Sequence, residues 1–227
     1  MTKLVISDVH AHWLHLKKLV ESFGVKVDNN GNILYFPEGL VIYNLGDIVD
    51  RGEYPVECLH FFYQGLELGK VFSVMGNHDS KLYRHLKGNK IELWEEQLST
   101  VELIKGHEDW ILEFYSKLPY SIILPEVNLV HGQYSPNGEP KRYMFARSVK
   151  TENHQDNKIL PEDRYKWFEH YDGKYGWSLC GHFGENTVYF GNKCACIDSA
   201  VFRTGVLSGV YWEDEGIDNL KLIEVTL

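Results

Sequence analysis

The segment Asn44–Gly52 constrains this chain more than any other, because it puts two carboxylates and a guanidinium into one short loop. The apolar run Leu40–Leu45 leads into the loop and predicts a buried strand. Asp47 would project from the carboxyl end of that strand, and Asp50 and Arg51 follow in the same tight turn. Carboxylates hold cations and a guanidinium fork binds phosphate oxygens, so the loop suits a metal and phosphate site. Taken alone, the loop could also be a solvated turn.

The chain around this loop alternates between strand and helix patterns. Apolar runs predict strands at 4–6, 40–45 and 71–75, and helical spacing with glycine stops predicts helices at 13–23 and 55–69. Such an order is typical of a parallel α/β core with right-handed crossovers. Sites in these sheets form at the carboxyl ends of the strands, so polar residues directly after the apolar runs are the candidates.

The second half of the chain reads as strand-rich after a helical insertion at about 80–118. Strands are predicted at 121–124, 127–130 and 178–180, with a hairpin at 188–190 and 194–197. The segment 133–176 is polar and irregular, which is typical of a long functional loop. No domain boundary is visible in the 227 residues, so we expect a single domain over 1–227.

Charge and composition argue against some classes of partner. The formal net charge of −9 disfavours a long nucleic acid, whose binding needs a basic face. No stretch approaches the ~20 apolar residues of a membrane span. The first residues lack signal-peptide character, and no contact with a membrane is expected. The four cysteines show no zinc-ribbon spacing and are expected as reduced, packed thiols: Cys58, Cys180, Cys194 and Cys196. Reduced thiols make a cytoplasmic location the expected one.

Residues of metal-ligand type follow one apolar run after another, mostly with a glycine beside them. They are Asp8, His10, Asp47, Asp50, Asn77, His78, His131 and His182. Each is a weak signal alone, but their common placement predicts one shared site. Imidazoles with carboxylates and an amide oxygen suit Mn, Fe or Zn rather than calcium. The set is too large for one four-coordinate zinc, so two metals sharing a bridging carboxylate are expected.

These motifs resemble those of the calcineurin-like metallophosphoesterases, and more narrowly the phosphoprotein phosphatase superfamily with its bacterial and phage members. The matching segments are Asp8-x-His10, Gly46–Gly52, Gly76–Asp79, His131-Gly132, Gly181-His182 and Cys196–Arg203, the last similar to a terminal strand hairpin of the group. The run Gly76–Gly88 is similar to that of bacterial relatives that hydrolyse dinucleoside tetraphosphates or repair RNA ends. The resemblance implies an α/β fold with two packed mixed β-sheets flanked by helices.

The resemblance also implies which residues hold the two metals. The first metal would be bound by Asp8, His10 and Asp47. The second would be bound by Asp47, Asn77, His131 and His182. A hydroxide shared by the metals would then attack phosphorus directly, without a covalent enzyme intermediate.

The remaining site residues would handle the proton and the substrate. By the same resemblance, His78 and Asp50 form a proton-handling pair, and Arg51 is a phosphate ligand. Asn77 is a further expected substrate contact, as is an arginine of the long loop, Arg142 or Arg147. The aromatic residues Tyr134, Tyr143, Tyr165 and Trp167 could stack on a base, or they could pack inward.

The predicted reaction is hydrolysis of a phosphate monoester, with phosphoserine or phosphothreonine in proteins as the leading substrate class and manganese as the leading metal. The enzymatic alternative is a small nucleotide, either a dinucleoside tetraphosphate or an RNA terminal phosphate. A non-catalytic binding scaffold is the distant alternative. Departures from the family pattern leave every ligand in place but weaken the substrate assignment; they are Ala11, Asp79, Gln133 and Phe183.

Overall fold

The computed structural model describes residues 1–134, 166–214 and 216–227. Arg142 and Arg147 fall outside these described residues, as do Tyr143, Tyr165 and most of the predicted loop at 133–176. No helix in the described part of the chain is long and apolar enough to cross a membrane.

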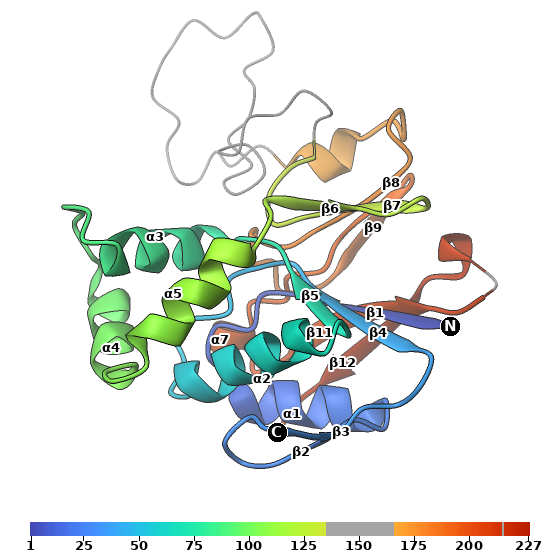
Figure 1. Cartoon of the computed structure of the whole chain (residues 1–227). Coiled ribbons are helices and arrows are strands. Elements are labelled where there is room, and N and C mark those ends of the chain that lie inside the picture. The colour runs from blue at the N-terminus through green and yellow to red at the C-terminus, as the bar shows by residue number, and fades with distance from the viewer. Residues whose placement is uncertain (135–165, 215) are drawn as a thin grey trace, which may run out of the picture.

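The first sheet contains five strands in the order β12-β11-β1-β4-β5 (Figure 1). Its centre is parallel, with β1 (Thr2–Ile6) beside β4 (Leu40–Asn44) and β4 beside β5 (Val71–Ser73). This is the alternation that the sequence predicts. Two strands that the sequence pattern did not reveal extend one edge, where β11 (Leu207–Trp212) pairs antiparallel with both β1 and β12 (Lys221–Val225).

The second sheet also contains five strands, in the order β6-β7-β8-β10-β9. Three central strands run parallel: β7 (Val127–Val130), β8 (Trp177–Cys180) and β10 (Cys194–Cys196). Antiparallel strands close its two edges: β6 (Ser121–Ile123) beside β7, and β9 (Tyr189–Gly191) beside β10. Both sheets are therefore mixed, and the expected α/β architecture of two packed sheets is confirmed.

The helices lie on one side of the first sheet and at one end of it. Figure 1 shows α1 (Trp13–Ser22) and α2 (Pro55–Glu67) over the face that points away from the second sheet. The helical insertion consists of α3 (Asn77–Leu86), α4 (Glu95–Leu103) and α5 (Glu108–Lys117). It begins at Asn77 rather than near residue 80, so a predicted ligand is the first residue of a helix.

The remaining elements are short. They are the hairpin β2 (Lys26–Val27) and β3 (Ile33–Tyr35), the 3₁₀ turns η2 (Trp167–His170) and η3 (Ile217–Asn219), and helix α7 (Val201–Thr204). The segment Cys196–Arg203, which resembles a terminal strand hairpin, does not form a hairpin in the structure. Strand β10 ends at Cys196, and the short helix α7 follows.

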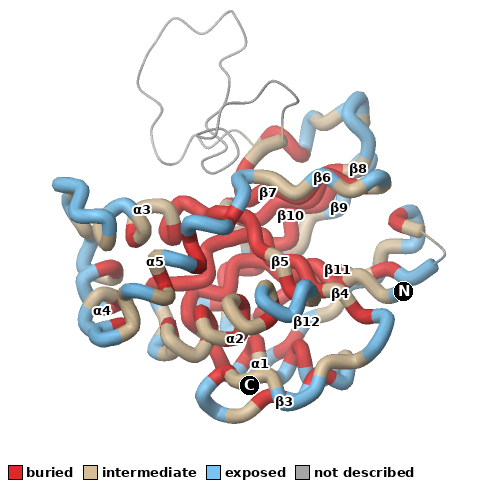
Figure 2. The backbone as a smooth tube through the Cα atoms, in the orientation of Figure 1, coloured by how far each residue is buried: buried red, intermediate tan, exposed pale blue. Residues whose placement is uncertain are grey.

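Alternating side chains of the first sheet fill two separate apolar cores. On β1, Leu4 and Ile6 pack among the helices, while Val5 faces the second sheet. On β4, Ile42 and Tyr43 divide between the same two cores. Figure 2 shows the buried residues, in red, gathered in the middle of the molecule, with exposed residues toward its outside. Burial on both faces explains why the strands read as short, almost continuous apolar runs.

The outer face of the second sheet packs against η2. Cys180, Cys194 and Cys196 lie in this third core, and all four cysteines are free and buried, as expected. Trp167 belongs to the same core and its Nε1–H donates to the Gly132 carbonyl at 3.0 Å. Trp167 therefore packs inward, and it is unsuited to the alternative role of stacking on a base.

Candidate metal centre and catalytic site

The backbone bends sharply at the carboxyl ends of the strands. Five of the predicted site residues adopt the left-handed region, with φ values of 46° at His10, 50° at Asp47, 70° at Asp50, 70° at Arg51 and 73° at His182. Such conformations are unfavourable for side-chain-bearing residues by roughly 1 kcal/mol or more each, and they persist where the surrounding structure imposes them. They cluster here because each turn aims a polar side chain into the same space.

Glycines let these turns approach one another. A Cβ on Gly76 would lie 2.2 Å from the backbone nitrogen of Asp47, so the loops after β4 and β5 touch backbone to backbone. A Cβ on Gly181 would lie 2.0 Å from Asp8 Oδ1. The glycines beside the predicted ligands are therefore required by close packing of the loops.

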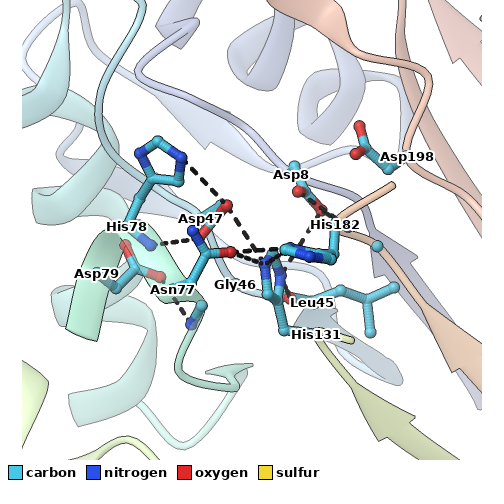
Figure 3. A network of polar contacts seen from close by, with 12 residues as sticks. Asp8, Leu45, Gly46, Asp47, Asn77, His78, Asp79, His131, His182 and Asp198 are labelled. Carbon is cyan, nitrogen blue, oxygen red and sulfur yellow. Dashed lines mark hydrogen bonds and ion pairs between the residues drawn. The ribbon is translucent and has the colours of Figure 1, made fainter. Parts of the chain in front are cut away.

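Asp47 lies at the centre of the site (Figure 3). Its Oδ1 accepts a 2.9 Å hydrogen bond from the backbone N–H of His78, and its Oδ2 lies 3.3 Å from His131 Nε2. Two groups of side chains that could hold a metal share this carboxylate: His10, Asp47 and His78, and Asp47, His131 and His182. Burial raises the pKa of Asp47, but the surrounding imidazoles more than offset this and hold it well below its ordinary value.

The second of these groups has the donor atoms that a metal requires. His131 Nδ1 lies 2.8 Å from the Leu45 carbonyl, so Nδ1 carries the proton and Nε2 presents a lone pair in the neutral ring. That Nε2 lies 2.9 Å from Asn77 Oδ1, and His182 Nδ1 lies 2.8 Å from the same oxygen. Lone pairs from imidazole, amide and carboxylate thus converge on one point, which fits a divalent cation.

The tautomer of His10 is fixed in the same way. Its Nδ1 lies 3.0 Å from the Val49 carbonyl, which leaves Nε2 as the acceptor. Nε2 faces Arg51 Nη1 at 3.1 Å and Asp47 Oδ2 at 3.9 Å. Burial lowers the pKa of His10 well below its ordinary value, so the ring is neutral and able to bind a metal.

Asp8 lies beside these groups but belongs to neither. Both of its oxygens accept the backbone N–H of His182, at 3.1 and 3.2 Å. Burial, together with the charges of Asp198 and Asp47, raises the pKa of Asp8 well above its ordinary value. A bound cation at this place would compensate that concentration of buried carboxylates.

Asp198 is a site residue that the sequence analysis includes in the Cys196–Arg203 segment without giving it a role in the site. It is 2% exposed, it lines the pocket, and its Oδ1 accepts the Ala200 N–H at 2.9 Å. The signal was available, because Asp198 follows the buried strand β10 in the same way that the other acids follow their strands.

His78, Asp50 and Thr100 form a linear chain of hydrogen bonds. His78 Nδ1 lies 2.6 Å from Asp50 Oδ2, and Thr100 Oγ1 donates to Asp50 Oδ1 at 2.6 Å. Burial would lower the pKa of His78, but the charges of Asp47 and Asp50 raise it above its ordinary value. The arrangement holds one imidazole in a fixed orientation with its Nε2 directed into the site. Thr100 had no signal in the sequence.

Arg51 lies across the mouth of the site. Its Nη2 is 3.2 Å from His78 Nε2, and its guanidinium carbon lies 4.1 Å from the centroid of the Phe202 ring. Arg51, Phe202 and Arg203 help to line a pocket of about 210 Å³ that also reaches His10, Asp47, Asn77, His78 and His182. A guanidinium at this position can bind the oxygens of a phosphate that enters the pocket. Phe202 and Arg203 had been recognised only as part of the Cys196–Arg203 segment.

Comparison with known proteins places this geometry in a family. The sequence profile of the calcineurin-like phosphoesterases matches residues 1–209. The chain is 28% identical over 222 residues to the bis(5'-nucleosyl)-tetraphosphatase PrpE (asymmetrical) of Bacillus subtilis. The alignment covers 90% of this chain and 88% of the relative.

Two solved structures illustrate the likeness in fold. The crystal structure of a proposed diadenosine tetraphosphatase superposes with a TM-score of 0.69 at 20% identity, covering 99% of this chain and 92% of the other. A serine/threonine phosphatase of Saccharomyces cerevisiae gives a TM-score of 0.65 at 14% identity, covering 100% and 80%.

The family match spans nearly the whole chain, and the side chains at the strand ends could hold metal ions. A metal-dependent phosphoester hydrolase is the enzyme class that these findings indicate. This chain therefore belongs to the calcineurin-like phosphoesterase family.

Proposed function

We propose that this enzyme hydrolyses dinucleoside tetraphosphates, the alternative rather than the leading substrate class of the sequence analysis. The observation that carries the proposal is the 28% identity to the Bacillus subtilis tetraphosphatase over 90% of this chain. Six further bacterial relatives bear the same name. The likeness to a serine/threonine phosphatase, at 14% identity, concerns the fold and gives no argument for a phosphoprotein substrate.

The donor set supports two divalent cations that share Asp47. One cation would lie among His10, Asp47 and the neighbouring Asp8, and the other among Asp47, Asn77, His131 and His182. When bound, such a pair supplies Lewis acidity to the phosphate oxygens and lowers the pKa of a water. Imidazole and carboxylate ligands suit manganese, iron or zinc, and manganese is the first metal to test.

The chain's own residues supply orientation and a proton. Arg51 would bind non-bridging oxygens of the phosphate and stabilise the charge that grows on them. His78, held by Asp50, would present a proton at Nε2 to the leaving oxygen. Overall, one water adds across a P–O–P bond, its oxygen joins the attacked phosphorus, and its two protons are shared between the two products.

The state of the thiols supports a proposal for the location of the enzyme. Four free cysteines, Cys58, Cys180, Cys194 and Cys196, suit a reducing compartment, and we propose the cytoplasm.

The experiment is a side-by-side assay of diadenosine tetraphosphate, a phosphoserine peptide and p-nitrophenyl phosphate, with manganese added or removed by a chelator. We expect the chelator to abolish turnover of every substrate that the enzyme hydrolyses. The tetraphosphate should have the highest kcat/KM of the three compounds. A phosphopeptide kcat/KM that exceeds the tetraphosphate value would reject the proposed substrate while leaving the metal centre intact.

A further inference from the structure

A half-exposed tryptophan lies directly against the proton-handling histidine. The ring of Trp94 is 5.6 Å from the ring of His78, centroid to centroid, at an interplanar angle of 62°. His78 is 3% exposed, whereas Trp94 is 51% exposed. A large aromatic side chain that stays open to solvent beside a buried histidine at the site has a surface available for a ligand.

A lysine covers part of the same tryptophan. Lys81 follows His78 by one turn of α3, and its Nζ lies 3.4 Å from the centroid of the Trp94 ring. Among the described residues, Lys81 forms no ion pair, and the nearby Glu96 instead approaches Arg51 at 3.6 Å and His78 at 3.8 Å. The ammonium group is therefore held in place by a ring and retains its capacity to bind an anion.

The position of this pair relative to His78 determines which part of a substrate it would meet. A general acid delivers its proton to the oxygen that leaves, so groups in contact with His78 lie on the leaving-group side of the scissile bond. For a dinucleoside tetraphosphate the leaving group is itself a nucleotide, so it contains phosphate as well as a base. A lysine point charge binds phosphate, and an exposed indole stacks on a base.

We propose that Lys81 and Trp94 form the subsite for the leaving nucleotide, with Lys81 on its phosphates and Trp94 on its base. The inference rests on the proposed function, since the leaving group of a phosphoserine peptide has neither phosphates nor a base, and that of an aryl phosphate has a small ring but no further phosphate. It assigns a specificity role to the helical insertion, because Trp94 is the residue immediately before α4.

The first test compares two substrates in four variants. Trp94→Ala and Lys81→Ala should each lower the ratio of kcat/KM for diadenosine tetraphosphate to kcat/KM for p-nitrophenyl phosphate by roughly tenfold or more. Trp94→Phe and Lys81→Arg should recover much of that ratio. A proportional loss on both substrates would mean that Trp94 merely packs against His78, and an unchanged ratio would equally overturn the subsite.

The hairpin β2–β3 provides matched controls, because Lys26 lies 5.9 Å from the ring of Tyr35, which is 53% exposed. This pair is an exposed lysine and an exposed aromatic on an element that contributes nothing to the pocket. Lys26→Ala and Tyr35→Ala should leave both substrates unaffected. A fall in the ratio for these controls as well would assign the effect to general loss of surface residues.

A second measurement separates the subsite from the substrate proposal. The inhibition of p-nitrophenyl phosphate hydrolysis is measured with ATP and, separately, with tripolyphosphate, which has no base. Manganese is kept in excess in both assays. Trp94→Ala should weaken inhibition by ATP roughly tenfold while sparing inhibition by tripolyphosphate, and Lys81→Ala should weaken both. If the wild-type enzyme fails to hydrolyse the tetraphosphate, the proposed function falls, whereas unaltered ATP inhibition in both variants would reject the subsite itself.

Discussion

Thr100 donates a 2.6 Å hydrogen bond to Asp50 although the two residues are 50 positions apart in the chain. Thr100 is 2% exposed and Asp50 is fully buried. The bond fixes the carboxylate from the side opposite His78, which occupies the other oxygen at 2.6 Å. Helix α4 thus completes a chain of hydrogen bonds that starts outside the site and ends at His78.

Replacing Thr100 with valine tests whether this bond orients His78. Thr100→Val keeps the shape of the side chain but leaves Asp50 Oδ1 without its donor, a loss of ~1–3 kcal/mol for a buried acceptor. We expect kcat to fall roughly tenfold or more, with a greater fall for alkyl than for aryl phosphates. Thr100→Ser should restore activity because it returns the hydroxyl. Equal kinetics for the valine and serine variants would limit Thr100 to packing.

The role of His78 is tested through the leaving group. His78→Asn should lower kcat by roughly 10²–10⁴ for an alkyl phosphate, whose leaving oxygen needs a proton. The loss should be smaller for p-nitrophenyl phosphate, whose leaving group departs as a stable anion. Metal content, measured by elemental analysis, should stay at the wild-type value. An identical loss on both substrates would exclude general acid catalysis by this residue.

The placement of most site residues could be predicted because it follows from local structure. A short apolar run sets where a strand ends, and neighbouring parallel strands end at the same edge of a sheet. Asp47 and Asn77 meet in this way after β4 and β5, and His131 and His182 after β7 and β8. The two sheets then pack face to face through Val5, Leu129 and their neighbours, which brings both edges to one place.

The residues that were missed depend on packing between elements. Thr100 and Trp94 belong to the helical insertion, and only the docking of α4 near α2 and α3 decides which side chains reach Asp50 and His78. The sequence leaves two roles open for Trp167 for the same reason, since its inward packing depends on the position of η2 over the second sheet. A hydrophobic pattern gives the buried face of an element but not its partner.

Asp47 is expected to be indispensable to both metals. Its Oδ2 lies 3.3 Å from His131 Nε2 and 3.9 Å from His10 Nε2, so it belongs to both ligand groups. Asp47→Asn removes the charge and should reduce bound manganese below one equivalent per chain, with activity near background. Asp109→Asn changes an exposed acid in the first turn of α5 and serves as the control. Two metals per chain in the Asp47 variant would refute the shared carboxylate.

The role of Arg51 in phosphate binding can be tested by kinetics. Its guanidinium lies at the pocket mouth, supported by the Phe202 ring at 4.1 Å and by Glu96 at 3.6 Å. A fork that binds phosphate in both the ground state and the transition state should, on mutation to alanine, raise KM and also lower kcat. We expect kcat/KM to fall by roughly 10²-fold, in line with loss of a charge-assisted bidentate contact of ~1.5–3 kcal/mol.

Arg51→Lys separates charge from geometry in the same assay. Lysine restores the positive charge but offers a point charge in place of a planar fork, so recovery should be partial. Phe202→Ala should reproduce a weaker version of the Arg51→Ala defect, because it removes the surface on which the guanidinium rests. Unchanged KM and kcat in Arg51→Ala would instead make Arg51 a structural partner of Glu96, and the double variant with Glu96→Gln would then show the same thermal stability as either single variant.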